Sequence, residues 1–255
     1  MTHIVSLYSY RGGTGRSTTA ANVARLLAAD GARVAVVDTA LQYPSLHTLF
    51  GIDRLPEWTS FTDYLLGRCS LWDVVREVPL RESGPVGTSG RLFALPACNL
   101  PYKLEIIQTR GYDIGMLGEA FKLLSEELDL DHLILDTSAG LSNETTVALA
   151  AGQTVLTLAR ADRVDLVSAR PNAEVVRSLS RGQLMLVLSR APGGDANALI
   201  EQIEQAYGLP VTTALPSAAE AAEVSGELLF VEAFPEHPLT ASYRKIAEAL
   251  VEAAI

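Results

Sequence analysis

The chain has 255 residues, of which 48% are hydrophobic and 20% charged, and its formal net charge is −10. This length and composition can bury a sizeable core, so we expect residues 1–255 to form a single domain. The acidic balance disfavours a general attraction to nucleic acid or anionic lipid. No apolar run approaches a membrane span, and strand-like sequence by Ile4 leaves no room for a secretory signal, so we expect a cytoplasmic protein.

Apolar, β-branched runs alternate with helix-period segments along the chain. We predict strands over 4–8, 33–37, 91–95, 132–135, 154–158, 184–188 and 211–215. We predict helices over 16–29, 114–128, 143–151, 165–180, 196–206 and 239–254, with short helices near 60–66 and 71–77. This alternation favours an α/β fold with three layers, in which helices cover both faces of a mainly parallel, twisted sheet. Glycine and proline punctuate residues 79–91, where we expect a mobile surface loop.

A glycine-rich turn joins the first predicted strand to the first predicted helix. Residues 10–19 read Tyr-Arg-Gly-Gly-Thr-Gly-Arg-Ser-Thr-Thr. Glycines allow backbone N–H groups to converge on an anion, and the helix N-terminus adds partial positive charge. The hydroxyl of Ser17 is placed to bind a magnesium ion. A turn that binds nothing is the alternative, but glycines, arginines and hydroxyls in this setting favour phosphate binding.

Two aspartates end predicted strands. Asp38 follows Val34-Ala35-Val36-Val37, and Asp136 follows Leu133-Ile134-Leu135. The carboxyl ends of parallel strands line the crevice in which ligands bind in open α/β sheets. One such aspartate can orient magnesium and the other can position an attacking water. Each could instead be a helix cap or turn residue, an explanation that is weaker for two matching positions.

These motifs resemble the MinD/ParA family of deviant Walker-A ATPases, which have a P-loop nucleotide-binding fold. The family signature Lys-Gly-Gly-X-Gly-Lys-Ser/Thr is matched by Arg11-Gly12-Gly13-Thr14-Gly15-Arg16-Ser17. Val36-Val37-Asp38 and the run from Leu133 to Gly140 match two further motifs. The segment after Asp38 resembles the pilus-localising branch, called CpaE or TadZ, while the middle of the chain looks like MinD.

The resemblance implies an ATP- or ADP-binding protein that uses Mg²⁺ and forms a homodimer enclosing two ATP molecules. Arg11 matches the lysine that reaches the partner's phosphates, and Arg16 matches the loop lysine on the β- and γ-phosphates. Asp136 matches the Walker-B aspartate, Asp38 the aspartate after the second strand, and Arg190 lies where the family contacts the base. The implied catalytic residues are Arg11, Arg16, Asp38 and Asp136, and the implied metal-site residues are Ser17, Asp38 and Asp136. The implied nucleotide cradle comprises Gly12, Gly13, Thr14, Gly15, Arg16, Ser17, Thr18 and Arg190.

Three departures from the family pattern make nucleotide binding more secure than turnover. Arg11 and Arg16 keep the charge of lysine but not its shape. Ala40 stands where MinD has a second aspartate implicated in hydrolysis. We therefore predict a weak ATPase, an ATP-dependent dimeric switch that positions or assembles a cellular structure with an unidentified partner or cargo. A non-hydrolysing nucleotide-binding scaffold is the main alternative, and a metabolic ligase of this fold is a weaker one.

Three further features carry less information. A locally basic region from Arg160 to Arg190 makes DNA binding conceivable, but neighbouring acidic residues favour a solvated helix face or a dimer rim. The C-terminal helix carries Arg244 and Lys245 followed by glutamates, so we expect no autonomous membrane anchor. Cys69 and Cys98 have no metal-ligand spacing, which disfavours an iron–sulfur protein.

Overall fold

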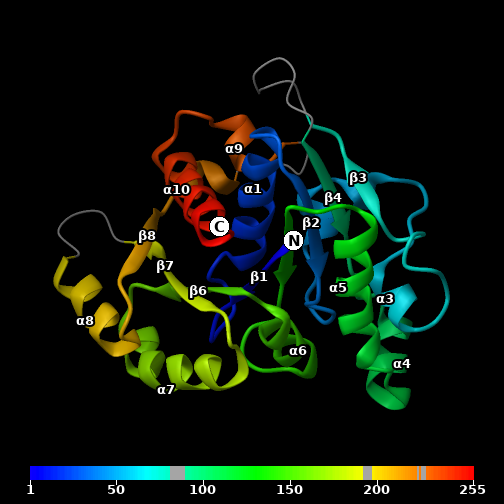
Figure 1. The fold of residues 1–255 in the computed structure, drawn as a ribbon, viewed down its shortest axis with the longest axis horizontal. Helices are drawn as coiled ribbons and strands as arrows, with labels where there is room; N and C mark the ends of the chain where they lie inside the picture. Colours follow the sequence, from blue (N-terminus) through cyan, green and yellow to red (C-terminus); the bar gives the residue numbers. More distant parts are fainter. Residues whose placement is uncertain (81–89, 192–196, 223, 225–227) are drawn as a thin grey trace.

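The structure is a computed structural model that describes residues 1–80, 90–191, 197–222, 224 and 228–255. Its central element is one sheet with the strand order β3-β4-β2-β5-β1-β6-β7-β8 (Figure 1). All neighbouring strands pair in parallel except β3 and β4. The strands are β1 (His3–Tyr8), β2 (Arg33–Asp38), β3 (Arg76–Val78), β4 (Arg91–Leu95), β5 (His132–Asp136), β6 (Thr154–Arg160), β7 (Gln183–Ala191) and β8 (Val211–Pro216).

Helices cover both faces of this sheet (Figure 1). They are α1 (Arg16–Ala29), α2 (Leu46–Leu49), α3 (Phe61–Leu65), α4 (Pro101–Arg110), α5 (Gly115–Glu127), α6 (Asn143–Ala151), α7 (Arg163–Leu179), α8 (Asn197–Tyr207), α9 (Phe230–Ala233) and α10 (Pro238–Ala253), with 3₁₀ turns at Ile52–Arg54 and Ala219–Ala222. The predicted α/β architecture is therefore confirmed.

Strand β2 explains why both faces are covered. Val34 and Val36 pack in one core cluster with α1 and α10, whereas Ala35 and Val37 pack in another with α3 and α5. Because successive side chains of a strand point to opposite faces, an unbroken apolar run requires apolar layers on both sides. The run from Val34 to Val37 satisfies this requirement, and all four residues are fully buried.

The strand order changes direction around β1. Strand β5 lies on one side of β1 and β6 on the other, and the chain reaches β6 from β5 through α6. Ligands of open α/β sheets bind at such switch points, outside the carboxyl ends of the strands. The turn from Ser9 to Gly15 leaves β1 at this edge, so the topology places the glycine-rich segment at the expected ligand crevice.

The stretch from 71 to 113 departs most from expectation. The predicted helix near 71–77 is wrong, because the chain forms a turn and then the short antiparallel edge strand β3. Helix α4 was not predicted, and Lys103 is its only buried residue. Most of the predicted mobile loop at 79–91 lies outside the described residues, and its last residue, Arg91, begins β4. Over the described parts of the chain, no helix has the length and apolarity needed to cross a membrane.

Candidate functional site

The glycine-rich turn forms an open cradle at the start of α1. Gly13 and Gly15 have φ angles of +75° and +82°, a left-handed conformation that side-chain-bearing residues rarely adopt. A Cβ atom built on either glycine would have no atom within 4 Å. Both positions therefore face open space, as expected for a turn whose backbone must approach a ligand closely.

This turn lines a cavity of about 320 Å³. Gly12 to Thr18 form one wall, so the predicted cradle is brought together apart from Arg190. Ala40, Tyr43 and Ser45 line it from the segment after β2, and Ser138 and Ala139 from the segment after β5. Tyr43 and Ser45 were not predicted as site residues, although their position just after a strand that ends at this edge is a usable signal.

Asp136 lies beneath this cavity with no exposed surface. Neither carboxylate oxygen has a hydrogen-bond partner among the described residues. Burial raises the pKa of Asp136, while the guanidinium of Arg16 and the hydroxyl of Ser17 act to lower it. A buried carboxylate without hydrogen bonds is costly, so this site favours a cationic ligand.

Asp38 pairs with Asp136 in the register of β2 and β5 and is equally buried. Its Oδ1 accepts the N–H of Ala40 at 3.1 Å, and its Oδ2 accepts those of Ser45 at 3.1 Å and Leu46 at 3.2 Å. Burial and the charge of Asp136 raise the pKa of Asp38, against these backbone bonds. Asp38 thus fixes the segment that forms the second wall of the cavity, a role in addition to any in catalysis.

The chemistry of this donor set fits a magnesium ion. Mg²⁺ is usually held by one or two carboxylates together with waters and substrate phosphates, rather than by a complete protein cage. The unpartnered oxygens of Asp136 and the cavity-lining Ser17 supply such ligands. Within the described residues, no cluster of three or more His, Cys, Asp or Glu side chains forms a metal site, so phosphate oxygens and water would complete the shell.

Arg16 begins α1 and turns back over the ends of β1 and β5. Its Nε donates to the carbonyl of Thr137 at 3.0 Å and its Nη1 to the hydroxyl of Ser9. The Nε lies 4.0 Å from Asp136 Oδ1, too far for a hydrogen bond but close enough for electrostatic attraction. Burial lowers the pKa of Arg16, and the nearby carboxylates oppose this change, so the guanidinium stays charged.

Arg11 is held within its own chain. Its Nε donates to Asp165 Oδ1 at 2.6 Å and its Nη2 to Asp162 Oδ2. Asp162 caps α7 by accepting the N–H groups of Val164 and Asp165. The sequence does not reveal this pairing, because Arg11 lies 151 residues from Asp162 and 154 residues from Asp165 in the chain.

Arg190 lies apart from the cradle. It is the residue before the last of β7 and has a left-handed conformation with φ of +52°, and its side chain is exposed rather than lining the cavity of the glycine-rich turn. A non-glycine residue in this conformation is uncommon. Residues 192–196, which follow β7, lie outside the described part of the chain.

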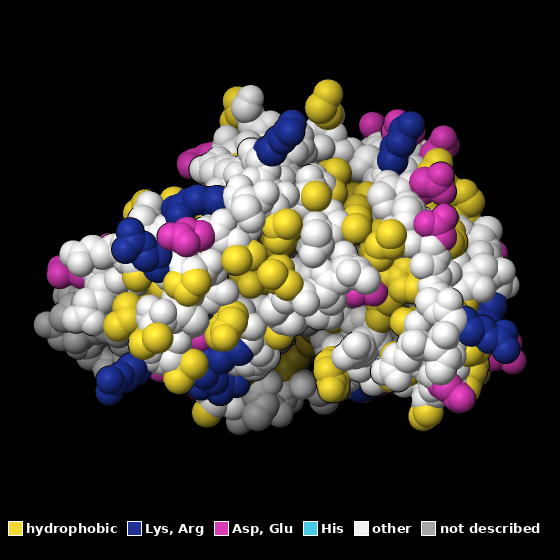
Figure 2. Space-filling view, turned by 90° about the horizontal axis from the view of Figure 1, so that it is seen from below, with side chains coloured by type: hydrophobic (Ala, Val, Ile, Leu, Met, Phe, Trp, Pro, Cys, Tyr) yellow, Lys and Arg dark blue, Asp and Glu magenta, His cyan; other side chains and the backbone are white. Residues whose placement is uncertain are grey.

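Large apolar side chains are exposed near the site. They include Tyr10 and Tyr43, with Leu141 after β5 and Val164 and Val167 on α7. Figure 2 looks from below onto the side where α6 and α7 lie, and apolar side chains extend across the middle of this face. Apolar surface of this kind marks a candidate protein contact.

The fold and cradle define a P-loop nucleotide-binding protein of the α/β class. The model of the CobQ/CobB/MinD/ParA nucleotide binding domain matches residues 5–229. The chain therefore belongs to this family, and it is a MinD/ParA-type ATP-binding protein.

Known relatives agree with this assignment over nearly the whole chain. An iron–sulfur cluster carrier protein of Pseudomonas fragi is 30% identical, over 96% of this chain and 84% of that protein. An uncharacterized ATP-binding protein of Methanocaldococcus jannaschii is 23% identical, over 98% of this chain and 88% of that one. The septum site-determining protein MinD of Pyrococcus horikoshii, solved with Mg-ADP, has a TM-score of 0.83 at 22% identity and covers 100% of this chain and 98% of its own.

Proposed function

We propose that the protein is an ATP-dependent dimeric switch with slow hydrolysis, which positions or assembles a cellular structure through a partner or cargo. The observation that carries the proposal is the fully buried Asp136, whose carboxylate accepts no hydrogen bond in the described structure and has only the guanidinium of Arg16, 4.0 Å away, beside the open glycine cradle. In a nucleotide-binding fold, this arrangement suits Mg²⁺ and the phosphates of ATP or ADP.

Each part of the site has a distinct role in this proposal. The N–H groups of the turn and the start of α1 bind phosphate oxygens, while Arg16 supplies positive charge beside them. Ser17 and Asp136 hold the metal, and bound Mg²⁺ neutralises charge on the phosphates. Asp38 shapes the opposite wall through its bonds to Ala40, Ser45 and Leu46 and is the candidate for positioning water.

Dimer formation gives Arg11 a second role. In the isolated chain its guanidinium is neutralised by Asp162 and Asp165. A partner's nucleotide offers competing phosphates, so ATP shifts the population toward the dimer if Arg11 binds those phosphates more strongly in the dimer. The exposed apolar residues around the site, such as Tyr43 and Val167, supply surface for that contact.

Light scattering coupled to size exclusion tests the switch directly. We expect a monomer without nucleotide and with ADP, and a dimer with ATP and Mg²⁺. A mass that does not respond to nucleotide contradicts the proposal. A parallel assay of phosphate release should show slow, steady turnover that the Asp136→Asn variant abolishes.

A non-hydrolysing scaffold is the second candidate. It is favoured by Arg16, which the chain holds on Ser9 and Thr137, and by Ala40 at the cavity wall where no carboxylate stands. Saturable nucleotide binding, with no more phosphate release than the Asp136→Asn variant gives, would support the non-hydrolysing scaffold over the switch.

The finer assignments remain predictions. They are the pilus-localising or MinD-like branch, a cytoplasmic location, the absence of an autonomous membrane anchor, and a single domain over 1–255. DNA binding stays disfavoured, and so does a metabolic ligase. Iron–sulfur binding is not proposed, because thiolates hold such clusters; Cys98 is buried, and burial raises the pKa of the Cys69 thiol.

A further inference from the structure

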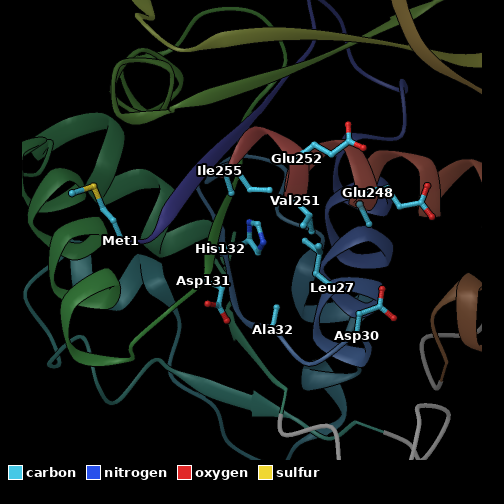
Figure 3. Close-up of a pocket in the computed structure, with 12 residues that line it drawn as sticks. Met1, Leu27, Asp30, Ala32, Asp131, His132, Glu248, Val251, Glu252 and Ile255 are labelled. Carbon is cyan, nitrogen blue, oxygen red and sulfur yellow. The ribbon is translucent and has the colours of Figure 1, made fainter.

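Figure 3 shows a second cavity, of about 710 Å³. It lies at the amino ends of the parallel strands, whereas the glycine-rich turn lies at their carboxyl ends. His132, the first residue of β5, lines it, whereas the turn leaves the carboxyl end of the parallel strand β1. The two cavities share no lining residue. Leu27 of α1 and Val251 of α10 supply apolar surface to the second one. Its volume falls within the roughly 300–1,000 Å³ typical of ligand pockets.

Negative charge surrounds this apolar surface. Glu248 and Glu252 lie four residues apart on α10, both exposed, and neither has an ion-pair partner among the described residues. Like charges at this spacing repel each other. Asp30 and Asp131 line the cavity from the ends of α1 and of the segment before β5.

The backbone adds to this negative potential. Both α1 and α10 end at the cavity, and neither has a basic residue in its last turn. Helix C-termini carry partial negative charge and favour cations. Two other carboxylates at the rim are engaged within the chain: Asp30 pairs with Arg244 at 3.2 Å, and Asp131 accepts the backbone N–H of Arg33 at 2.8 Å. The arrangement leaves the two glutamates available to a positively charged ligand.

One buried polar side chain in the cavity lacks a partner. His132 is only 4% exposed, and its Nδ1 has no hydrogen bond to any described residue. Figure 3 shows its ring in the middle of the side chains that line the cavity. Burial, and then the neighbouring His3, lower the pKa of His132 to about 4, so the ring is neutral near pH 7. A neutral imidazole can still donate one hydrogen bond and accept another.

We propose that this cavity docks a basic segment of a partner protein, with an apolar side chain against Leu27 and Val251, lysine or arginine heads on Glu248 and Glu252, and a polar group on His132. Charge complementarity identifies the occupant, since the unpaired glutamates and two helix C-termini together select cations. A second copy of this chain, with a net charge of −10 and basic residues that are interspersed with acidic ones, fits that chemistry less well. The site is separate from the nucleotide cavity, so the proposal does not depend on the proposed function.

Acetylated and amidated peptides of the form Lys-Arg-Xaa-Arg-Lys are the probe, with Leu, Phe or Trp at Xaa. Binding is measured by calorimetry in about 150 mM salt, where long-range attraction to the acidic chain is screened. We expect saturable binding by at least one peptide and much weaker binding when Xaa is Ser. If none of the apolar peptides binds below about 1 mM, or if the Ser peptide binds equally well, the proposal is wrong.

Matched variants separate the cavity from net charge. Glu248→Gln/Glu252→Gln should weaken binding at least about fivefold, as expected for the loss of two partly exposed ion pairs. Glu57→Gln/Glu105→Gln removes the same charge at exposed positions outside the cavity. This control should change the peptide affinity less than about twofold. Equal weakening by both would overturn the proposal.

Imidazole nitrogen spectra locate the peptide independently. The chain has four histidines, and we expect the His132 signals to shift on binding while those of His47 and His237 stay in place. Binding without any change at His132 would also contradict the proposal.

Discussion

Asp136→Asn should make the nucleotide-free protein more stable, although it removes the carboxylate proposed to hold magnesium. Asp136 has no exposed surface and no hydrogen-bond partner in the described structure, and burial raises its pKa. Asparagine has nearly the same shape without the charge. An uncompensated buried polar or charged group costs on the order of 1–3 kcal/mol, and Arg16 at 4.0 Å offsets part of this. We therefore expect the free energy of unfolding to rise by about 1–2 kcal/mol near pH 8.

The stability gained by Asp136→Asn should depend on pH. A carboxyl whose pKa is higher in the folded state ionises more readily when unfolded, so the wild-type fold loses relative stability as pH rises from about 4. The advantage of Asp136→Asn should thus be larger at pH 8 than at pH 5.

Urea denaturation in the presence of EDTA, at both pH values, measures this difference. The exposed Asp53→Asn is the matched control and should change stability by less than about 0.5 kcal/mol. If Asp136→Asn is less stable than wild type at pH 8, or if its effect does not depend on pH, the reasoning about an uncompensated carboxylate is refuted.

Three further variants test the other parts of the site. Gly15→Ala should lower the free energy of unfolding by about 1–2 kcal/mol, because a left-handed alanine is strained, and should weaken ATP binding about tenfold or more, because it places a methyl group in the cradle. Gly67→Ala, with φ of +68° and equally open space, should lower stability similarly without weakening ATP binding. Equal ATP affinity of the two variants would contradict the cradle. Asp162→Asn keeps the cap of α7 but weakens the ion pair with Arg11, so light scattering should detect the proposed ATP-bound dimer at several-fold lower protein concentration. A weaker dimer would show that the Arg11–Asp162 pair does not compete with dimer formation. Arg16→Lys should destabilise the nucleotide-free protein by about 1–2 kcal/mol through loss of the bonds to Ser9 and Thr137, measured by urea denaturation, and unchanged stability would show that those bonds contribute little.

The sheet and the conformation of the glycine-rich turn were predictable because their signals are local. Each of the seven predicted strands is present, because parallel strands that are buried on both faces have continuous apolar sequences such as Val34 to Val37. The glycine-rich turn is likewise a continuous segment between a strand and a helix. Topology then brought Asp38 and Asp136 into register, as expected from their matching strand ends.

The remaining features depend on contacts that the sequence does not reveal. Strand β3 has three residues, too few for a period to be recognised, and in the described part of the chain it pairs with β4 alone. Helix α4 is mostly exposed and so lacks an apolar stripe. Arg11 and Asp165, which form an ion pair, are 154 residues apart in the sequence. The bonds that Asp38 accepts from the N–H groups of Ser45 and Leu46 depend on the conformation of the segment after β2. The His132 cavity is lined by residues of α1, of α10 and of the segment before β5, which lie far apart in the sequence.

Calorimetric titration of the nucleotide-free protein with ATP and Mg²⁺ tests the central claim most directly. We predict saturable heat at one nucleotide per chain, and its loss when inorganic triphosphate already occupies the cradle. No detectable heat with ATP, ADP or GTP in the presence of Mg²⁺ would contradict the assignment of the turn after β1 as a nucleotide site.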